Sequence, residues 1–149
     1  MNTNNKHYLT INEYNNHYKK FIKFSTKKGK KHTIENNYRK ALFHAAKKQE
    51  NFWKVTNLAI ENTTTYLNVK VKRQGSKNIY IPIKIKDNYR TFLAYNWILS
   101  NLKNKSSLKF YQKFINEIVQ TAENKSASSK KKTEVYKLVE ENIHNIWKK

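Results

Sequence analysis

The sequence predicts a mainly α-helical fold: a single domain, residues 1–149, of about six helices with a protruding β-hairpin inserted between the third and fourth helices. Three observations predict it. Apolar residues recur at helical spacing over most of the chain. Between about residues 66 and 86 the pattern changes to an alternation typical of strands, with Gly75 near its centre. A chain of 149 residues can bury one core but is too short for two domains of ordinary size.

The N-terminal region is predicted to form one helix after an irregular start at residues 1–8. The helix is expected to end before Gly29, since glycine is the commonest residue just past a helix end. The turn Lys27–Lys31 then places four lysines around that glycine, namely Lys27, Lys28, Lys30 and Lys31. It is either a solvated helix end or a loop that contacts phosphates, and the overall charge favours the loop. The apolar positions of the helix are Ile11, Tyr14, Tyr18, Phe21 and Ile22.

Two further helices are expected before the hairpin. Thr33 is predicted to cap the second, with Glu35 in its first turn. The third is predicted from about Asn51 to Asn62, and the β-branched run Thr63–Thr65 is expected to end it. The buried positions of the two helices are predicted as Ile34, Tyr38, Ala41, Leu42, Ala45, Phe52, Val55, Leu58 and Ala59.

The hairpin is predicted from two alternating segments joined by a tight turn at Gly75 and Ser76. We expect one apolar face that lies against the helices, because an isolated two-stranded ribbon is marginally stable in water. That face is assigned Leu67, Val69, Val71, Ile79, Ile81, Ile83 and Ile85. The other face and the tip are assigned Lys70, Lys72, Arg73, Lys77, Lys84 and Lys86, which either bind an anion or serve only solubility.

Three helices are expected after the hairpin. Asp87 or Asn88 is predicted to cap the fourth, which is apolar nearly all round and therefore the most buried. Ser106 or Ser107 is predicted to cap the fifth. Residues 124–132 are interpreted as a polar, basic linker, and the last helix is expected from about Thr133. The predicted buried positions are Phe92, Leu93, Tyr95, Trp97, Ile98, Leu102, Phe110, Phe114, Ile115, Ile118, Val119, Val135, Leu138, Val139, Ile143, Ile146 and Trp147.

The charge of the chain indicates a polyanionic partner. Thirty-one Lys and Arg residues against 10 Asp and Glu give a formal charge of +21 at pH 7. Folding such a chain alone costs self-repulsion, which a nucleic acid would relieve. No apolar run approaches the roughly 20 residues of a membrane span, so no membrane partner is expected.

No catalytic or metal-binding set is visible in the sequence. Asp87 is the only aspartate, there is no Cys, and the five histidines show no i, i+4 pair. We therefore expect a protein that is not an enzyme and that has no metal and no cofactor. His32, beside Lys31, either contacts RNA or is a solvated loop histidine.

Several short strings, taken in their order and spacing, resemble one family, the small-subunit ribosomal protein seven of bacteria and organelles. The most specific is Tyr80-Ile-Pro-Ile83, followed by Arg90 and Trp97-Ile98. The others are Lys20-Phe-Ile-Lys23, Gly29-Lys-Lys31, Ala59-Ile-Glu-Asn62, Val71-Lys-Arg-Gln-Gly75, Asn116-Glu117, Ala122-Glu-Asn-Lys125 and Lys130-Lys-Lys132. The resemblance covers the chain from about residue 18 to the C-terminus.

The resemblance implies a structural protein of the small ribosomal subunit. Members of the family bind the three-prime major domain of small-subunit ribosomal RNA, lie beside other proteins of the subunit head, and nucleate assembly of the head. Their hairpin reaches toward the exit-site transfer RNA and messenger RNA. Carried over to this chain, the RNA-contacting residues are Lys28, Lys30 and Lys31 in the turn, Lys70, Lys72, Arg73, Gly75 and Lys77 in the hairpin, Arg90, and a basic loop of Lys130, Lys131 and Lys132.

The chain departs from the family pattern in three ways. Ser76 replaces the second glycine of the hairpin turn, lysines replace most of the arginines, and the first residues lack an Arg-rich arm. Lysine binds phosphate as a point charge without the bidentate geometry of arginine. We therefore still expect RNA binding, but the atomic contacts that arginines make in other family members do not transfer to these lysines.

The same residues bear on two other functions and on the cellular location. An architectural DNA-binding protein would use the hairpin as a groove-binding arm, but the tip Arg73–Lys77 has no apolar wedge. A nuclease would lack aspartates for its metals. Abundant Lys, Asn, Ile and Tyr indicate an AT-rich genome, and the first residues show no import peptide. We therefore expect the mitochondrial, organelle-encoded member, with a plastid or the cytoplasm of an AT-rich bacterium as alternatives.

Overall fold

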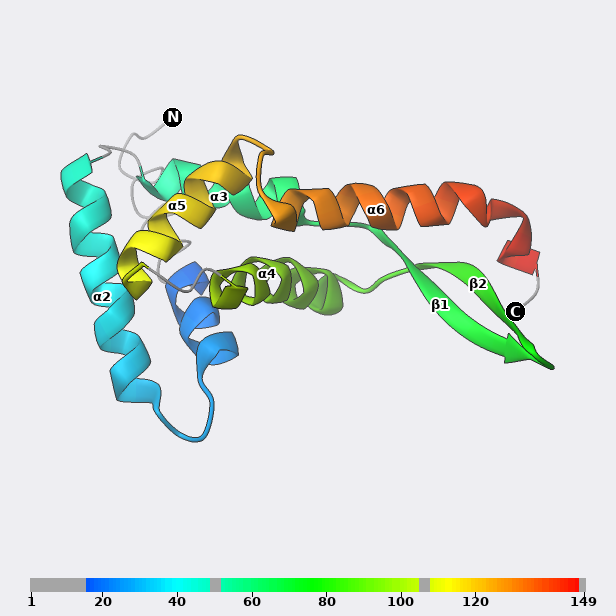
Figure 1. Ribbon diagram of the computed structural model, residues 1–149, viewed down its shortest axis with the longest axis horizontal. Helices are drawn as coiled ribbons and strands as arrows, with labels where there is room; N and C mark the ends of the chain where they lie inside the picture. The colour runs from blue at the N-terminus through cyan, green and yellow to red at the C-terminus, as the bar shows by residue number, and fades with distance from the viewer. Residues whose placement is uncertain (1–15, 49–51, 105–107, 148–149) are drawn as a thin grey trace, which may run out of the picture.

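The computed structural model describes residues 16–48, 52–104 and 108–147. The N-terminal helix covers residues 16–25 of this part. It is followed by α2 (Lys31–Lys48), α3 (Phe52–Thr63), β1 (Leu67–Gln74), β2 (Lys77–Lys84), α4 (Asp87–Asn104), α5 (Phe110–Ala122), α6 (Ala127–Glu141) and the 3-10 helix η1 (Ile143–Trp147). The predicted fold class is confirmed: a helical body with one antiparallel hairpin between α3 and α4 (Figure 1).

The core of the body is an aromatic cluster to which the N-terminal helix, α2, α3, α4 and α5 contribute. Phe21 of the N-terminal helix meets Tyr95 of α4 and Phe114 of α5 edge to face, with ring centroids 4.7 and 5.2 Å apart. Tyr38 of α2 meets Phe114 in the same way at 4.9 Å. Such edge-to-face pairs add to the stabilisation from burial. Helix α4 is deeply buried, as predicted, through Leu93, Ala94, Tyr95, Ile98, Leu99 and Leu102.

The turn before α2 differs from the prediction. The N-terminal helix ends at residue 25, and α2 begins at Lys31, so Thr33 lies inside the first turn of α2 and does not cap it. Lys28 and Gly29 both have positive φ, 51° and 70°. The N–H of Lys30 donates to the carbonyl of Lys27 at 3.2 Å, which closes a turn of type I′. This turn needs two left-handed residues, and only one of them is a glycine.

Helix α3 presents a face to the core that differs in part from the predicted one. Leu58 was expected to be buried but is 47% exposed, while Thr56 and Thr63 are buried. The hydroxyl of Thr56 donates to the carbonyl of Phe52 at 2.9 Å, and that of Thr63 to the carbonyl of Ala59 at 2.8 Å. A threonine whose hydroxyl is satisfied within its own helix can enter the core, and a count of apolar residues misses it.

The first turns of α4 and α5 also correct the predicted caps. Asp87 is the first residue of α4, where its carboxylate lies near the positive end of the helix dipole. The cap of α5 is Lys109, whose N–H is accepted by the side chain of Gln112. The predicted caps Ser106 and Ser107 lie outside the described residues. Phe92 of α4, expected inside, is 38% exposed.

The segment between α5 and α6 is a compact junction and not the predicted linker. Asn124 has a φ of 58°, the N–H of Lys125 donates to the carbonyl of Gln120 at 2.8 Å, and that of Asn124 to Thr121 at 3.1 Å. These two bonds form a Schellman motif that ends α5. Ser126 then caps α6 by accepting from the N–H groups of residues 128 and 129. Residues 130–132, predicted as a loop, therefore lie in the first two turns of α6.

A buried carboxylate joins the three helices around this junction. Glu117 of α5 is fully buried. It accepts hydrogen bonds from Asn101 of α4 at 2.8 Å, from Ser128 of α6 at 2.7 Å and from Thr121 at 3.3 Å. Both oxygens of this side chain are therefore satisfied by neighbouring elements, and leaving a buried polar group without such partners costs about 1–3 kcal/mol. The network therefore fixes how α6 leaves the body.

The C-terminal helix begins and ends earlier than predicted and is more exposed. It ends at Glu141, and the chain continues as η1. Val139 is buried, whereas Leu138, Ile143 and Trp147 are 39%, 59% and 91% exposed, so their assignment to a buried stripe is wrong. Figure 1 shows the reason: α6 runs away from the body beside the hairpin, which covers only one side of it.

The register of the hairpin contradicts the single apolar face. Val69 pairs with Pro82 and Lys70 pairs with Ile81. Residues directly opposite each other in an antiparallel pair point to the same face. The valines of β1 and the isoleucines of β2 therefore lie on opposite faces. Each face combines the apolar row of one strand with the polar or charged row of the other.

The hairpin is supported along its sides by α6 and η1, whereas residues 71–78 around its tip are all exposed. Ile81 and Ile85 are 4% and 8% exposed, whereas Val71 nearer the tip is 52% exposed. Helix α6 contacts β1, and η1 contacts β2, where the side chain of Asn145 donates to the carbonyl of Tyr80 at 3.2 Å. The tip of the hairpin lies farthest from the helical body (Figure 1).

One half-buried histidine predicts acid sensitivity. His17 is hydrogen-bonded to the Tyr95 hydroxyl and packs against Trp53. Burial, with a smaller contribution from the charge of Lys20, lowers the pKa of His17 to about 4. The unfolded chain, with an ordinary pKa of about 6.5, then binds more protons than the folded chain between these values. The free energy of unfolding should therefore fall as the pH drops through this window.

We expect a loss of about 1 kcal/mol between pH 6.5 and 5, allowing for solvent screening of the half-buried ring. Urea unfolding at both pH values measures it in the parent chain, in His17→Gln and in the exposed-site control His32→Gln. The control should keep the pH dependence and His17→Gln should lose most of it. Equal pH dependence in all three proteins would rule out this role for His17.

Candidate nucleic-acid interface

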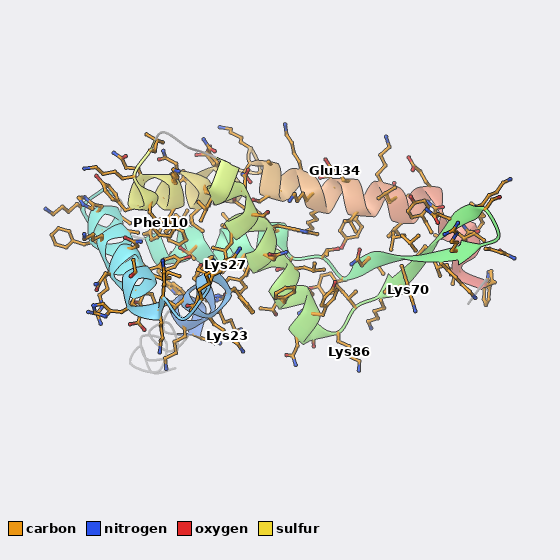
Figure 2. The ribbon with its side chains drawn as sticks, turned by 60° about the horizontal axis from the view of Figure 1, so that its bottom comes forward. Lys23, Lys27, Lys70, Lys86, Phe110 and Glu134 are labelled. Atoms are coloured by element: carbon orange, nitrogen blue, oxygen red, sulfur yellow. The ribbon has the colours of Figure 1, made fainter. Side chains whose placement is uncertain are left out.

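Lysines from three separate elements gather on one side of the molecule. In Figure 2, Lys23 and Lys27 lie at the end of the N-terminal helix, Lys86 lies before α4, and Lys70 lies on the hairpin. All four side chains are exposed. Glu134 lies on α6 along the opposite edge of the same view. We define this lysine-bearing side as the basic face.

The turn after the N-terminal helix presents the predicted lysines to solvent. Lys27, Lys28 and Lys30 are exposed, and none of them forms an ion pair within the described residues. Lys31 reaches Glu35 at 3.7 Å, as an i, i+4 pair on α2. Lys27, Lys28 and Lys30 thus lie exposed within one tight turn. Such a cluster is suited to several adjacent phosphates.

The hairpin carries its cations on both faces, as the register requires. Lys70, Lys72 and Lys77 share one face with the isoleucines, while Arg73 lies on the other. All are exposed. The guanidinium of Arg73 also donates to the carbonyl of Gly75 at 3.3 Å. A ribbon charged on both faces can contact an anionic partner along its two sides.

The turn of the hairpin explains how Ser76 is tolerated. Gly75 has a φ of 60°, and Ser76 is not among the left-handed residues of the described chain. This matches a type II′ turn, which requires positive φ only at its first central residue. A second glycine is therefore not needed at position 76.

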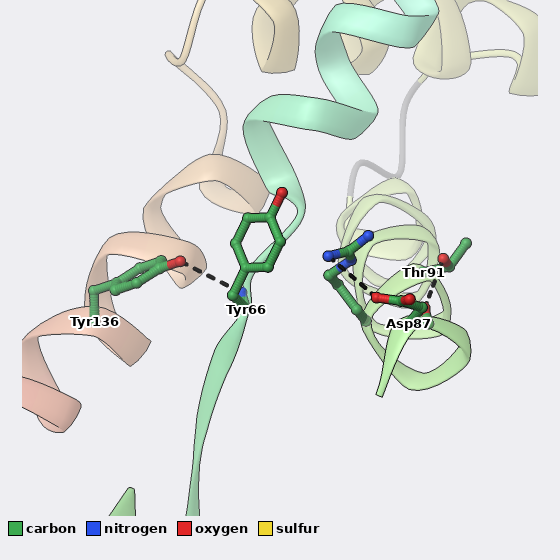
Figure 3. A network of polar contacts seen from close by, with 5 residues as sticks. Tyr66, Asp87, Thr91 and Tyr136 are labelled. Atoms are coloured by element: carbon green, nitrogen blue, oxygen red, sulfur yellow. Dashed lines mark hydrogen bonds and ion pairs between the residues drawn. The ribbon is translucent and has the colours of Figure 1, made fainter. Parts of the chain in front are cut away.

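Arg90 is held within the protein at the base of the hairpin. Its guanidinium lies 4.5 Å from the centroid of the Tyr66 ring and 3.3 Å from the Asp87 carboxylate. Figure 3 shows Tyr66 between Tyr136 on one side and the first turn of α4 on the other. The Tyr136 hydroxyl accepts a hydrogen bond from the backbone of Tyr66 at 3.4 Å. The start of β1, α4 and α6 thus meet around Tyr66, which directly precedes β1.

The three lysines at the start of α6 do not form one exposed cluster. Lys130 is exposed, but the ammonium of Lys131 donates to Ser100 of α4 at 3.2 Å, and that of Lys132 donates to the carbonyl of Glu61 at 3.4 Å. Further along, the exposed side of α6 carries mixed charge, including the pair Lys137–Glu141 at 3.9 Å. The charge of α6 is therefore less suited to a polyanion than that of the basic face.

One lysine and one group of residues were missed in the predicted site. Lys23 lies on the basic face, and its exposed position near the predicted turn could have suggested it. Lys86, on the same face, was already among the cations assigned to the hairpin. The missed group surrounds a pocket between the N-terminal helix, α2, α4 and α5. Its residues come from distant parts of the chain, so no local string signals it.

Among the described residues, no three His, Cys, Asp or Glu side chains are close enough together to hold a metal ion. Within the same residues, no helix combines the length and apolar character needed to cross a bilayer.

Comparison with known proteins identifies the family. Residues 1–142 match the family described as ribosomal protein S7p/S5e. The chain belongs to this family. A relative from Thermomicrobium roseum, named small ribosomal subunit protein uS7, is 30% identical over 132 residues, which cover 86% of this chain and 85% of the relative. A protein of the same name from Baumannia cicadellinicola is 30% identical with the same coverage.

A third relative of that name, from Campylobacter curvus, is 33% identical over 96 residues, or 62% of each chain. The resemblance stated from the short strings is therefore confirmed at the level of the family. Members of the S7p/S5e family are structural, non-enzymatic proteins of the small ribosomal subunit. The expectation of a protein without catalytic activity agrees with this membership.

Proposed function

We propose that this protein binds the three-prime major domain of small-subunit ribosomal RNA and nucleates assembly of the subunit head. The observation that carries the proposal is the basic face, where exposed lysines from the turn, the hairpin and the start of α4 share one side of the molecule (Figure 2). Membership of the S7p/S5e family supports a ribosomal partner for that face. Other proteins of the subunit head are its proposed neighbours.

Affinity in this proposal comes mainly from neutralised phosphates. Each lysine that replaces a counterion adds to the salt dependence of binding, with a slope of roughly −0.7 to −0.9 per phosphate. Specificity comes from the shape of folded RNA, because an RNA helix hides its base edges in a deep, narrow groove. A rigid helical body with a projecting ribbon fits a shape of this kind.

The outer half of the hairpin is proposed to lie near the exit-site transfer RNA and messenger RNA. The family resemblance supplies this position. The exposed tip, with charge on both faces, supports it, because a projecting cationic ribbon can reach RNA beyond the surface that holds the body. Lys70, Lys72, Arg73 and Lys77 are its proposed contacts.

The remaining predicted contacts take different parts in the proposal. Lys130 is exposed and available for RNA, while Lys131 and Lys132 are hydrogen-bonded within the protein and would have to exchange those partners. Arg90 is proposed to hold the base of the hairpin as well as to face RNA, since its guanidinium already contacts Tyr66 and Asp87.

The compartment is proposed on composition alone. The AT-rich residue usage favours an organelle-encoded mitochondrial protein. The relatives compared above are bacterial, and they agree with a bacterial cytoplasmic ribosome at least as well. Fractionation of the source cells, with the protein followed into organelle or cytosol, decides between the two.

Binding to separate RNA transcripts tests the proposed function. The protein should bind a transcript of the three-prime major domain at least about 10-fold more tightly than a transcript of the five-prime domain at equal salt. Lys72→Glu with Arg73→Glu should weaken the tighter complex while the thermal unfolding temperature stays unchanged. Equal affinity for both transcripts would overturn the assignment to the three-prime major domain. Unchanged binding by the variant would remove the hairpin from the interface.

A further inference from the structure

A pocket opens beside the basic face. It has a volume of about 430 Å³ and lies between the N-terminal helix, α2, α4 and α5. Small-molecule pockets span roughly 300–1,000 Å³, so this one has room for a ligand. Its apolar lining is Phe24, Ile34, Leu99, Leu102 and Phe110. Two of these side chains are aromatic rings, which suits a flat ligand.

Five polar residues line the pocket; Ser25 is hydrogen-bonded to the Tyr38 hydroxyl at 2.7 Å, and the other four have no such partner among the described residues. Asn37 and Asn96 line it, and neither side-chain amide makes a hydrogen bond within the described chain. Lys27 and Lys113 also line it, from the turn and from α5, and neither forms an ion pair among those residues. The pocket thus offers two amides and two ammonium groups above an apolar floor.

This combination matches the chemistry of one nucleotide. Proteins recognise unpaired RNA bases by stacking them on aromatic rings and by hydrogen bonds to their edges. An asparagine amide supplies one donor and one acceptor side for such an edge. An ammonium on either side of the pocket is suited to the phosphates that flank an extruded base.

We propose that this pocket binds one unpaired nucleotide of the partner RNA, with its base between Phe24 and Phe110 and its edge on Asn37 and Asn96. The proposal rests on the proposed RNA-binding function and adds a specific site to it. Continuity with the basic face supports it, because Lys27 belongs both to the pocket and to the turn. Figure 2 shows Lys27 and Phe110 on neighbouring parts of the body.

An acidic peptide is the main competing occupant. It would use the two lysines and the apolar floor but leave the unpaired amides without a planar edge to bind. The polyanion already inferred for the adjoining turn is a nucleic acid, and the same strand can continue into the pocket. A nucleotide therefore satisfies all four of the unpaired polar side chains with one ligand.

The first test uses the full chain and a transcript of the three-prime major domain. The double variant Asn37→Leu/Asn96→Leu removes both amides and keeps every charge. We expect its affinity to fall about 10-fold with an unchanged salt slope, since base contacts are lost and phosphate contacts are kept. Asn116→Leu, the same change at an exposed site on α5, is the matched control and should bind as the parent does.

The outcomes separate this inference from the proposed function. If the parent binds the transcript and the double variant binds equally well, the nucleotide pocket is overturned and the RNA-binding function stands. If the parent itself fails to bind, the proposed function fails first. Thermal unfolding of each variant shows whether a loss of affinity comes from a loss of fold.

A second test reports on the pocket directly. The photoreactive residue p-benzoyl-phenylalanine in place of Phe110 should crosslink, on irradiation with the transcript, to one unpaired nucleotide. Crosslinks to paired nucleotides only, or an absence of crosslinks in a variant that still binds the transcript, would overturn the proposal. Added poly-glutamate should leave the crosslink unchanged, and its loss would favour an acidic peptide as the occupant.

Discussion

Reversing three charges in the lysine turn and the hairpin should weaken RNA binding by roughly 100-fold or more near 0.15 M salt. The variant combines Lys27→Glu, Lys30→Glu and Lys72→Glu, which are exposed and form no ion pair in the described structure. Each lost phosphate contact removes roughly a 5-fold factor at this salt and reduces the salt slope by about 0.9. Filter binding to the three-prime major domain transcript at four salt concentrations measures both quantities.

A matched control separates position from net charge. Lys40→Glu, Lys54→Glu and Lys137→Glu together change the formal charge by the same amount at exposed sites on α2, α3 and α6. We expect this control to lose less than about 10-fold, because long-range attraction is screened beyond about 8–10 Å. An equal loss of affinity in the two variants would mean that RNA binding depends only on the total charge of the protein.

Removing the buried carboxylate should have the largest effect on stability. Glu117→Ala leaves Asn101, Ser128 and Thr121 without their shared acceptor and opens a void between α4, α5 and α6. We expect a loss of about 3 kcal/mol in the free energy of unfolding, or roughly 6–12 °C in the unfolding temperature. Thermal unfolding followed by circular dichroism measures the change.

Glu117→Gln tests whether the loss comes from hydrogen bonds or from volume. The amide keeps the size of the side chain and one acceptor oxygen, so it should lose less than half as much stability as alanine does. If glutamine destabilises as much as alanine does, the carboxylate itself is essential to the network. If neither substitution lowers the unfolding temperature, the network does not hold the three helices together.

The order of elements could be predicted from the sequence because periodicity is local. Apolar residues at helical spacing, such as Tyr38 and Ala41, predict the buried side of a helix. The alternation around Val69 predicts a strand in the same way. How two elements pack against each other is not a local property. The two strands alternate correctly, yet their register puts Val69 and Ile81 on opposite faces, and only the two-residue turn determines that register.

Other errors arose where polar residues form regular structure. Residues 124–132 look like a linker because they are rich in serine and lysine. In the fold, Asn124 closes a Schellman motif and Ser126 caps α6, so the same composition ends one helix and begins the next. An asparagine followed two residues later by a serine is a sequence signal that could have predicted this junction, because asparagine is tolerated in the left-handed conformation and serine is a common N-cap.

The candidate site likewise has a part that the sequence predicts and a part that only the fold shows. The lysines of the turn and hairpin could be named from sequence, because charge clusters and tight turns are local features. Their presence on one side of the molecule could not, since it depends on how α4 and the hairpin leave the body. The pocket formed by Phe24, Asn37, Asn96 and Phe110 is the extreme case, because these residues meet only in the fold.

Sedimentation of cell lysate on a sucrose gradient tests the central claim most directly. A component of the small ribosomal subunit should travel with that subunit in low salt. The variant Lys27→Glu/Lys30→Glu/Lys72→Glu should move in part to the top of the gradient, and the charge-matched control should stay with the subunit. If the parent protein remains at the top of the gradient in low salt, it is not a component of the small subunit.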